Sequence, residues 1–125
     1  MNAALVFLGG GIGSLLRFGV YHLARLWLPP SFPFGTLAVN AIGGLAAGLV
    51  AGTMLQRSAG GADPLYLFVM SGALGGFTTF SAFSLDAVLL WQRGEQGMAA
   101  IYVLASVLLA LVGVAAGMAA VRALA

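Results

Sequence analysis

Two polar side chains, Arg17 and Asn40, lie well inside long apolar stretches, where polar groups are rare and often functional. Arg17 lies deep within the first stretch, and a charged residue at membrane depth is costly enough to indicate a functional site. Asn40 ends the run GTLAVN in the second stretch, and its amide offers two N–H donors. Both could favour an anion. Each also has a structural interpretation, since Arg17 could bind free carbonyls or snorkel, and Asn40 could hold two helices together.

The most informative run is GALGGFTTFSAFS, residues 72–84, in the third apolar stretch. Two glycines followed by two β-branched threonines are poor helix formers in the middle of a span. A break there would free backbone carbonyls, which suit a cation, and amides, which favour an anion. We predict that the third helix is broken, and that carbonyls from two copies could meet at a two-fold axis and hold one small cation such as Na⁺. The alternative is a continuous, locally strained helix.

Two further pairs of side chains share a helix face. Phe80 and Phe83 are three residues apart, and the positive edges of their rings could contact a small anion in a narrow, dry passage. Tyr102 and Ser106 are four residues apart, and each hydroxyl could donate to an anion. Spacing alone also fits plain packing or lipid contact for the phenylalanines, an interfacial position for the tyrosine, and bonding of the serine to its own helix.

Enzymatic chemistry is not expected from this chain. It has no cysteine, which excludes thiolate sites. With one histidine (His22) and three scattered carboxylates, it also offers no metal cluster and no nucleophile–base–acid set. The glycines at 9–13 follow no strand, so they do not form a dinucleotide site. The five basic residues are scattered arginines, so a nucleic-acid partner is not expected either.

The surrounding elements are predicted to be membrane helices. Hydrophobic residues make up 62% of the 125 residues and charged residues 6%, whereas soluble domains carry roughly a quarter charged residues. A spanning helix needs about 20 mostly apolar residues. Four stretches qualify, at about 3–28, 34–56, 64–91 and 97–121. We therefore predict an all-α membrane protein with a single four-helix domain over residues 1–125, in contact with the lipid bilayer.

Glycines recur at four-residue spacing in three of these spans. They lie at positions 9 and 13, at 44, 48 and 52, and at 113 and 117. This spacing puts small residues on one helix face and lets neighbouring backbones approach closely. We expect most of them to serve packing alone.

The charges near the helix ends are almost evenly divided between the two membrane faces. Arg57 and Arg122 would lie on one side, and Arg25 and Arg93 on the other. Without a positive-inside bias the chain could insert in both orientations. Two opposite copies could then pair about a two-fold axis in the membrane plane, with a polar pathway between the subunits. The alternative is a single orientation that few charges specify only weakly.

Over nearly its whole length, the chain resembles the Fluc/CrcB family of fluoride channels. The resemblance rests on Gly9–Arg17 with its buried arginine, on Gly35–Asn40, and on the run Gly75–Ser81 with Phe83 following. The third motif is the most specific of the three. Length and the number of spans agree with the family as well.

The resemblance implies an antiparallel, dual-topology homodimer with two fluoride pores and one central, structural Na⁺. The Na⁺ would be held by the backbone carbonyls of Gly75 and Thr78. Phe80 and Phe83 would be the aromatic lining of the pores, and Asn40 the pore asparagine. Tyr102 and Ser106 look like the start of a polar track on the fourth helix, whose next hydroxyl position is Ala110 here.

The function implied is passive export of fluoride across a bacterial cytoplasmic membrane. Donors would replace the water around the ion, and the candidates are Asn40, Thr79, Ser81, Tyr102 and Ser106. Arg17 would act structurally or electrostatically. Two alternatives stay open: a small multidrug-type exporter, which wants a carboxylate in its first span where this chain has none, and a non-transporting membrane subunit.

Overall fold

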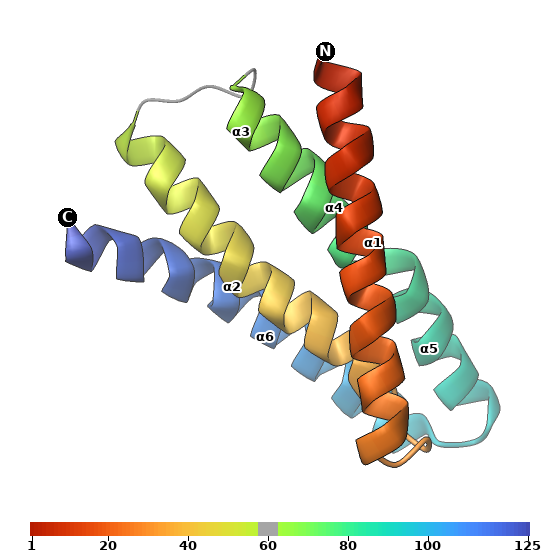
Figure 1. Cartoon of the computed structure of the whole chain (residues 1–125). Coiled ribbons are helices and arrows are strands. Elements are labelled where there is room, and N and C mark those ends of the chain that lie inside the picture. Colours follow the sequence, from red (N-terminus) through yellow and green to blue (C-terminus); the bar gives the residue numbers. More distant parts are fainter. Residues whose placement is uncertain (58–62) are drawn as a thin grey trace.

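The computed structural model describes residues 1–57 and 63–125, and all regular structure in them is helical. The elements in chain order are α1 (Asn2–Trp27), α2 (Phe34–Gln56), α3 (Pro64–Tyr66), the π-helix η1 (Leu67–Leu74), α4 (Gly75–Phe77), α5 (Phe80–Gln92) and α6 (Gln96–Leu124). Figure 1 shows α3, η1, α4 and α5 following one another as a single bent rod. This bent rod is the third span.

Four helical segments are long and apolar enough to cross a membrane: Asn2–Trp27, Phe34–Gln56, Pro64–Gln92 and Gln96–Leu124. Their ends lie close to the predicted span boundaries; the predicted 57–63 loop falls partly on residues 58–62, outside the described part. Large apolar side chains face outward, and Phe7 is 79% exposed. Such a surface suits lipid rather than water, and the protein is a multi-pass membrane protein.

The predicted break in the third helix is confirmed, and the extended backbone lies at the two threonines. Gly75 and Gly76 belong to the short helix α4, whereas Thr78 (φ −83°, ψ 160°) and Thr79 (φ −154°, ψ 116°) are extended. The Thr79 hydroxyl accepts a hydrogen bond from the N–H of Ala82 at 3.1 Å and so caps the N-terminus of α5. Threonine is a good cap and a poor helix interior residue, so the two threonines permit the break at this point.

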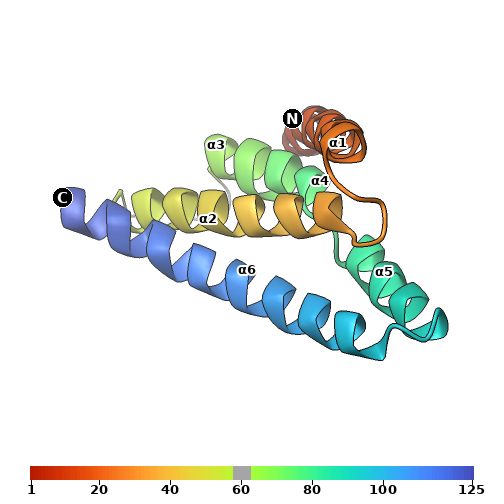
Figure 2. The ribbon, with the colours of Figure 1, turned by 90° about the horizontal axis from the view of Figure 1, so that it is seen from below.

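Helix α1 packs along the first half of the third span through glycines. A Cβ at Gly13 would collide with the carbonyl oxygen of Ala73, and one at Gly76 with the carbonyl oxygen of Gly10. The two backbones are therefore in direct contact, as the four-residue spacing predicted. In Figure 2, α1 lies above the rod formed by α3 and α4, on the side away from α6.

Helices α2 and α6 form the other close pair and lie side by side in both views (Figures 1 and 2). A Cβ at Gly48 would collide with the carbonyl oxygen of Val114, and one at Gly117 would lie 2.5 Å from the carbonyl oxygen of Leu45. Glycine on both helices thus lets the pair approach to backbone contact. The first half of the third span packs mainly on α1, and its second half, α5, packs mainly on α6.

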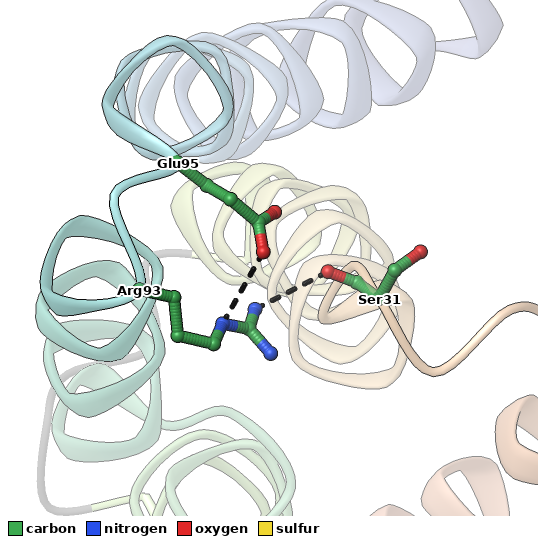
Figure 3. A network of polar contacts seen from close by, with 3 residues as sticks. All are labelled: Ser31, Arg93 and Glu95. Atoms are coloured by element: carbon green, nitrogen blue, oxygen red, sulfur yellow. Dashed lines mark hydrogen bonds and ion pairs between the residues drawn. The ribbon is translucent and has the colours of Figure 1, made fainter.

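A polar network joins the turn between α5 and α6 to the loop between α1 and α2. The Arg93 guanidinium donates to the carbonyl oxygen of Ser31 at 3.3 Å and lies 3.5 Å from a carboxylate oxygen of Glu95. Figure 3 shows Arg93 reaching between the two loops, with Glu95 on one side and Ser31 on the other. The ion pair is half-exposed and contributes little to stability. Its main effect is to tie two loops at one end of the bundle.

Candidate functional site

A groove with a volume of about 510 Å³ lies beside the break in the third span. Its lining comes from α2, from both halves of the third span and from α6. The lining residues are Asn40, Gly43, Gly44, Ala47, Met70, Leu74, Gly75, Thr78, Thr79, Phe80, Phe83, Ser106, Val107, Ala110 and Leu111. The groove is mostly apolar with a few polar groups, as small-ligand sites usually are.

Asn40 holds the extended backbone of the break with two hydrogen bonds. Its Nδ2 donates to the carbonyl oxygen of Thr79 at 3.0 Å, and its Oδ1 accepts from the N–H of Thr79 at 2.8 Å. The Asn40 amide therefore gives the N–H and the carbonyl of Thr79 the hydrogen-bond partners that a neighbouring backbone would otherwise provide. An amide nitrogen carries two hydrogens, and within residues 1–57 and 63–125 the Asn40 side chain bonds to Thr79 alone, so one N–H donor is left over at the groove wall.

The same contact releases a backbone carbonyl. In a continuous α-helix the N–H of Thr79 would bond the carbonyl oxygen of Gly75. Here that N–H donates to Asn40, so Gly75 lacks its helical partner, and Gly75 is exposed in the single chain. The oxygen of Gly75 is left as an acceptor at the edge of the groove.

Thr78 loses its helical partner in a similar way. The N–H of Ala82, four residues on, donates to the Thr79 hydroxyl instead of to the Thr78 carbonyl. The Arg17 Nη1 donates to the Thr78 oxygen at 3.1 Å. Arg17 thus binds a free carbonyl at the helix break. This contact is the structural role that the sequence left open for Arg17, beside a functional one.

Phe80, Phe83 and Tyr102 form a line of rings along one side of the site. The ring centroids of Phe80 and Phe83 are 5.4 Å apart at 47°, and those of Phe83 and Tyr102 are 5.5 Å apart at 41°. Phe80 is 79% exposed in the single chain, whereas Tyr102 is fully buried. The tilted rings present edges as well as faces, and hydrogen-bearing edges carry positive potential.

Ser106 supplies an unused donor to the groove. It is only 6% exposed, and its Oγ has no hydrogen-bond partner in the described ranges 1–57 and 63–125. A buried hydroxyl without a partner is costly, so it calls for an explanation. A bound anion would satisfy it. One turn on, Ala110 lines the groove with no hydroxyl to continue the track.

Two predicted donors do not line the groove. The Ser81 hydroxyl lies 3.2 Å from the Thr79 hydroxyl on an exposed part of α5. The Tyr102 hydroxyl donates to Oδ2 of Asp86 at 3.3 Å, so its single proton is directed at a carboxylate. Thr79 itself lines the groove, but its oxygen is also the cap acceptor for Ala82.

Asp86 is the centre of a polar cluster that the helix periodicity did not predict. Its Oδ2 accepts from the Thr36 hydroxyl at 2.6 Å as well as from Tyr102, and the Tyr21 hydroxyl lies 3.2 Å from that of Thr36. The cluster ties α1, α2, α5 and α6 together. It forms part of the wall of a second hollow of about 390 Å³, which Arg25 and Arg93 also line. The spacing of Asp86 three residues after Phe83 was the available signal, since it puts both on one helix face.

The chain is similar to proteins of one family over almost its full length. Residues 4–118 match the profile of the family described as "CrcB-like protein, Camphor Resistance (CrcB)". The protein named "Fluoride-specific ion channel FluC 2" from Nitrobacter hamburgensis is 51% identical over 98% of each chain. Proteins named "Fluoride-specific ion channel FluC" from Rhodopseudomonas palustris and Paracoccus denitrificans are 48% identical (99% of each chain) and 52% identical (90% of this chain, 88% of the relative).

These relatives bear the names of ion channels, which are not enzymes, in agreement with the expectation from the residue inventory. The motif-based resemblance is also confirmed. With a family profile matched over residues 4–118 and relatives about half identical over nearly the whole chain, this protein belongs to the CrcB-like family.

Proposed function

We propose that this protein is a fluoride-selective passive channel that works as an antiparallel, dual-topology homodimer. The observation that carries the proposal is the unpartnered hydroxyl of Ser106, buried in a groove that Phe80 and Phe83 also line. The Ser106 hydroxyl can donate to an anion, and the ring edges of Phe80 and Phe83 carry positive potential, so the groove suits a small anion. The names of the relatives identify fluoride as the ion.

Each pore would use residues of one groove. Asn40 has one N–H to spare and Ser106 a free O–H, so both can donate to the ion. Phe80 and Phe83 would line the passage with ring edges. Fluoride binds water tightly, so donors and ring edges have to replace its hydration shell together, and a narrow passage would exclude the larger chloride. Ser81 and Tyr102 belong to the path only if their hydroxyls turn from their present partners.

Two observations support a second, inverted copy. The groove is open, and Phe80 in its lining is 79% exposed in the single chain, so a second copy placed over Phe80 would supply a further wall. Figure 1 places the 28–33 and 93–95 loops at one end and both chain termini toward the other. The end with the two loops carries Arg25 and Arg93, and the other end Arg57 and Arg122, so the charges do not select one orientation. Such a dimer would contain two equivalent pores.

The residues at the break fit a structural Na⁺ at the dimer axis. Na⁺ prefers hard oxygen ligands, and the carbonyl oxygen of Gly75 has lost its helical partner. The Thr78 carbonyl accepts one hydrogen bond from Arg17 and keeps a second lone pair. Gly75 and Thr78 of both copies would hold the ion. Bound there, Na⁺ would join the two breaks electrostatically.

The proposed role is protection: fluoride leaves a bacterial cytoplasm down its gradient through this channel in the cytoplasmic membrane.

The multidrug-exporter alternative has less support. The first span has no carboxylate, and the Asp86 carboxylate in α5 is occupied by Thr36 and Tyr102. The non-transporting-subunit alternative leaves the Ser106 hydroxyl without a function.

Two experiments test the proposal in cells. A bacterial strain without its own fluoride exporter should grow at raised fluoride concentrations when it carries this gene, and growth limited to fluoride-free medium would contradict the channel.

Because the chain has no cysteine, Ser31→Cys provides a single label site in the loop that precedes α2. A membrane-impermeant maleimide should label about half of the molecules from outside whole cells, as dual insertion requires. Labelling of all or none would contradict dual topology.

A further inference from the structure

The face of α1 that packs on the third span ends in a charged residue. Gly9, Gly13 and Arg17 are four residues apart, so they lie one above the other on one side of the helix. Gly13 contacts the backbone of Ala73 and Phe77, and one turn on Arg17 reaches the carbonyl of Thr78. The glycine contacts fix the distance between the two backbones. The reach of the Arg17 side chain to the break is therefore set by packing.

The charge of Arg17 is not neutralised locally. The one ion pair within residues 1–57 and 63–125 joins Arg93 to Glu95, so no described carboxylate pairs with Arg17. Arg17 is half-buried, where a positive charge is felt more strongly than in water. Its described hydrogen-bond acceptor is the Thr78 oxygen.

Thr78 is also one of the two carbonyls proposed to hold Na⁺. A guanidinium and a metal ion on the two lone pairs of one oxygen are like charges at close range, and they repel each other. With no metal ion bound, the guanidinium satisfies an acceptor that the break has deprived of its helical partner. Arg17 therefore has opposite effects on the two states of the site.

We propose that Arg17 is a positioning residue for the cation site, in addition to any effect on anions. Its guanidinium holds the Thr78 carbonyl when Na⁺ is absent, and its charge lowers the affinity of the site for Na⁺. This inference rests on the Na⁺ site of the proposed function. It assigns to Arg17 a role in how readily the cation enters and leaves.

The test is the thermal unfolding midpoint of the purified dimer as a function of Na⁺, with N-methyl-D-glucamine chloride keeping the ionic strength constant. Arg17→Gln should lower the midpoint without Na⁺, because the Thr78 carbonyl loses its charged donor. It should also reduce the half-maximal Na⁺ concentration by about tenfold, because one nearby positive charge is gone. Arg17→Lys keeps the charge and should leave that concentration within about twofold of the wild-type value.

An unchanged or increased half-maximal Na⁺ concentration in Arg17→Gln would overturn the inference. No Na⁺ response in either protein would overturn both the cation site and the inference, while fluoride release from liposomes tests the channel separately. If Arg17→Gln does not fold, wild-type protein with ¹⁵N-labelled arginine provides the test. The arginine side-chain NMR signal that is missing in Arg17→Lys belongs to Arg17, and Na⁺ should shift it. A rise of the unfolding midpoint with Na⁺ but without this shift would contradict the role of Arg17 at the cation site.

Discussion

The side-chain amide of Asn40 is paired with the backbone of Thr79 through two hydrogen bonds, of 3.0 Å and 2.8 Å. This contact joins α2 to the break in the third span, and it is the reason that the Gly75 carbonyl lacks its helical partner. One residue thus supports the fold of the break, the proposed cation ligand and the wall of the groove. Its structural and functional interpretations are not alternatives, because the pairing uses one of its two N–H donors and leaves the other.

Replacing Asn40 by alanine should therefore damage stability and transport together. Thr79 would lose a donor and an acceptor partner in a half-buried site, which costs about 1–3 kcal/mol for each unsatisfied group. Fluoride release from liposomes should fall to near background. Unfolding of the detergent-solubilised protein and an electrode assay measure the two effects.

Gln56→Ala is the matched control for Asn40→Ala. Gln56 also donates from its amide to a backbone carbonyl, that of Val121 at 3.2 Å, but at the exposed end of α2. It should change neither stability nor release appreciably. Equal behaviour of the two variants would contradict the assignment of Asn40 to the site.

Phe80→Ile and Phe83→Ile should each abolish most fluoride release while the protein still folds. Isoleucine keeps the apolar character but removes the ring edges that the proposal assigns to the anion. Phe7→Ile is the control, because Phe7 is 79% exposed like Phe80 but lies in α1, outside the groove lining. Electrode measurements on the three reconstituted proteins compare them directly, and full release by Phe80→Ile would argue against a ring-lined pore.

Ser106→Ala should separate function from stability. The Ser106 hydroxyl has no partner in the described ranges of the chain, so its removal should leave the unfolding free energy unchanged or slightly higher. Fluoride release should fall by about tenfold or more, since a hydrogen bond to a charged group contributes about 1.5–3 kcal/mol.

Ser84→Ala is the control for Ser106→Ala, because the Ser84 hydroxyl donates to the Phe80 carbonyl in its own helix at 2.9 Å and lies outside the groove lining. Normal release from the Ser84 variant and slow release from the Ser106 variant are expected. The reverse order would show that the unpartnered hydroxyl is not the donor.

Gly48→Ala should destabilise the α2–α6 pair. The added Cβ would collide with the carbonyl oxygen of Val114, and overpacking of this kind typically costs about 1–3 kcal/mol. Gly11→Ala is the control, because nothing lies within 4 Å of its Cβ position. That variant should be as stable as the wild type or more so, as judged by thermal unfolding, since alanine is the better helix former.

Composition and local sequence predicted much of the fold. The four spans follow from hydrophobicity and length alone, and the close contacts of α1 with the third span and of α2 with α6 follow from glycine spacing. The existence of a break follows from helix propensity, but its position depends on the N-cap of α5 at Thr79. Thr79 could act as a cap in the sequence, yet only the contact with Asn40 shows why the chain leaves the helix at Thr78 and Thr79 and not at Gly75.

The polar contacts between distant helices were not predictable in the same way. Tyr102 was expected to offer its proton to an anion, and in the structure that proton is directed at Asp86. The contact of Thr36 with Asp86 was not predicted, although it is the shortest side-chain contact of that cluster. Such pairings depend on the rotation and tilt of whole helices, which the periodicity of a single helix does not contain.

The most direct test of the central claim is ion release from liposomes that contain the purified wild-type protein, measured with a fluoride electrode and then a chloride electrode. We expect rapid, passive fluoride release without an added energy source, and no chloride release above that of empty liposomes. Folded protein that releases no fluoride, or that releases chloride equally well, would contradict a fluoride-selective channel.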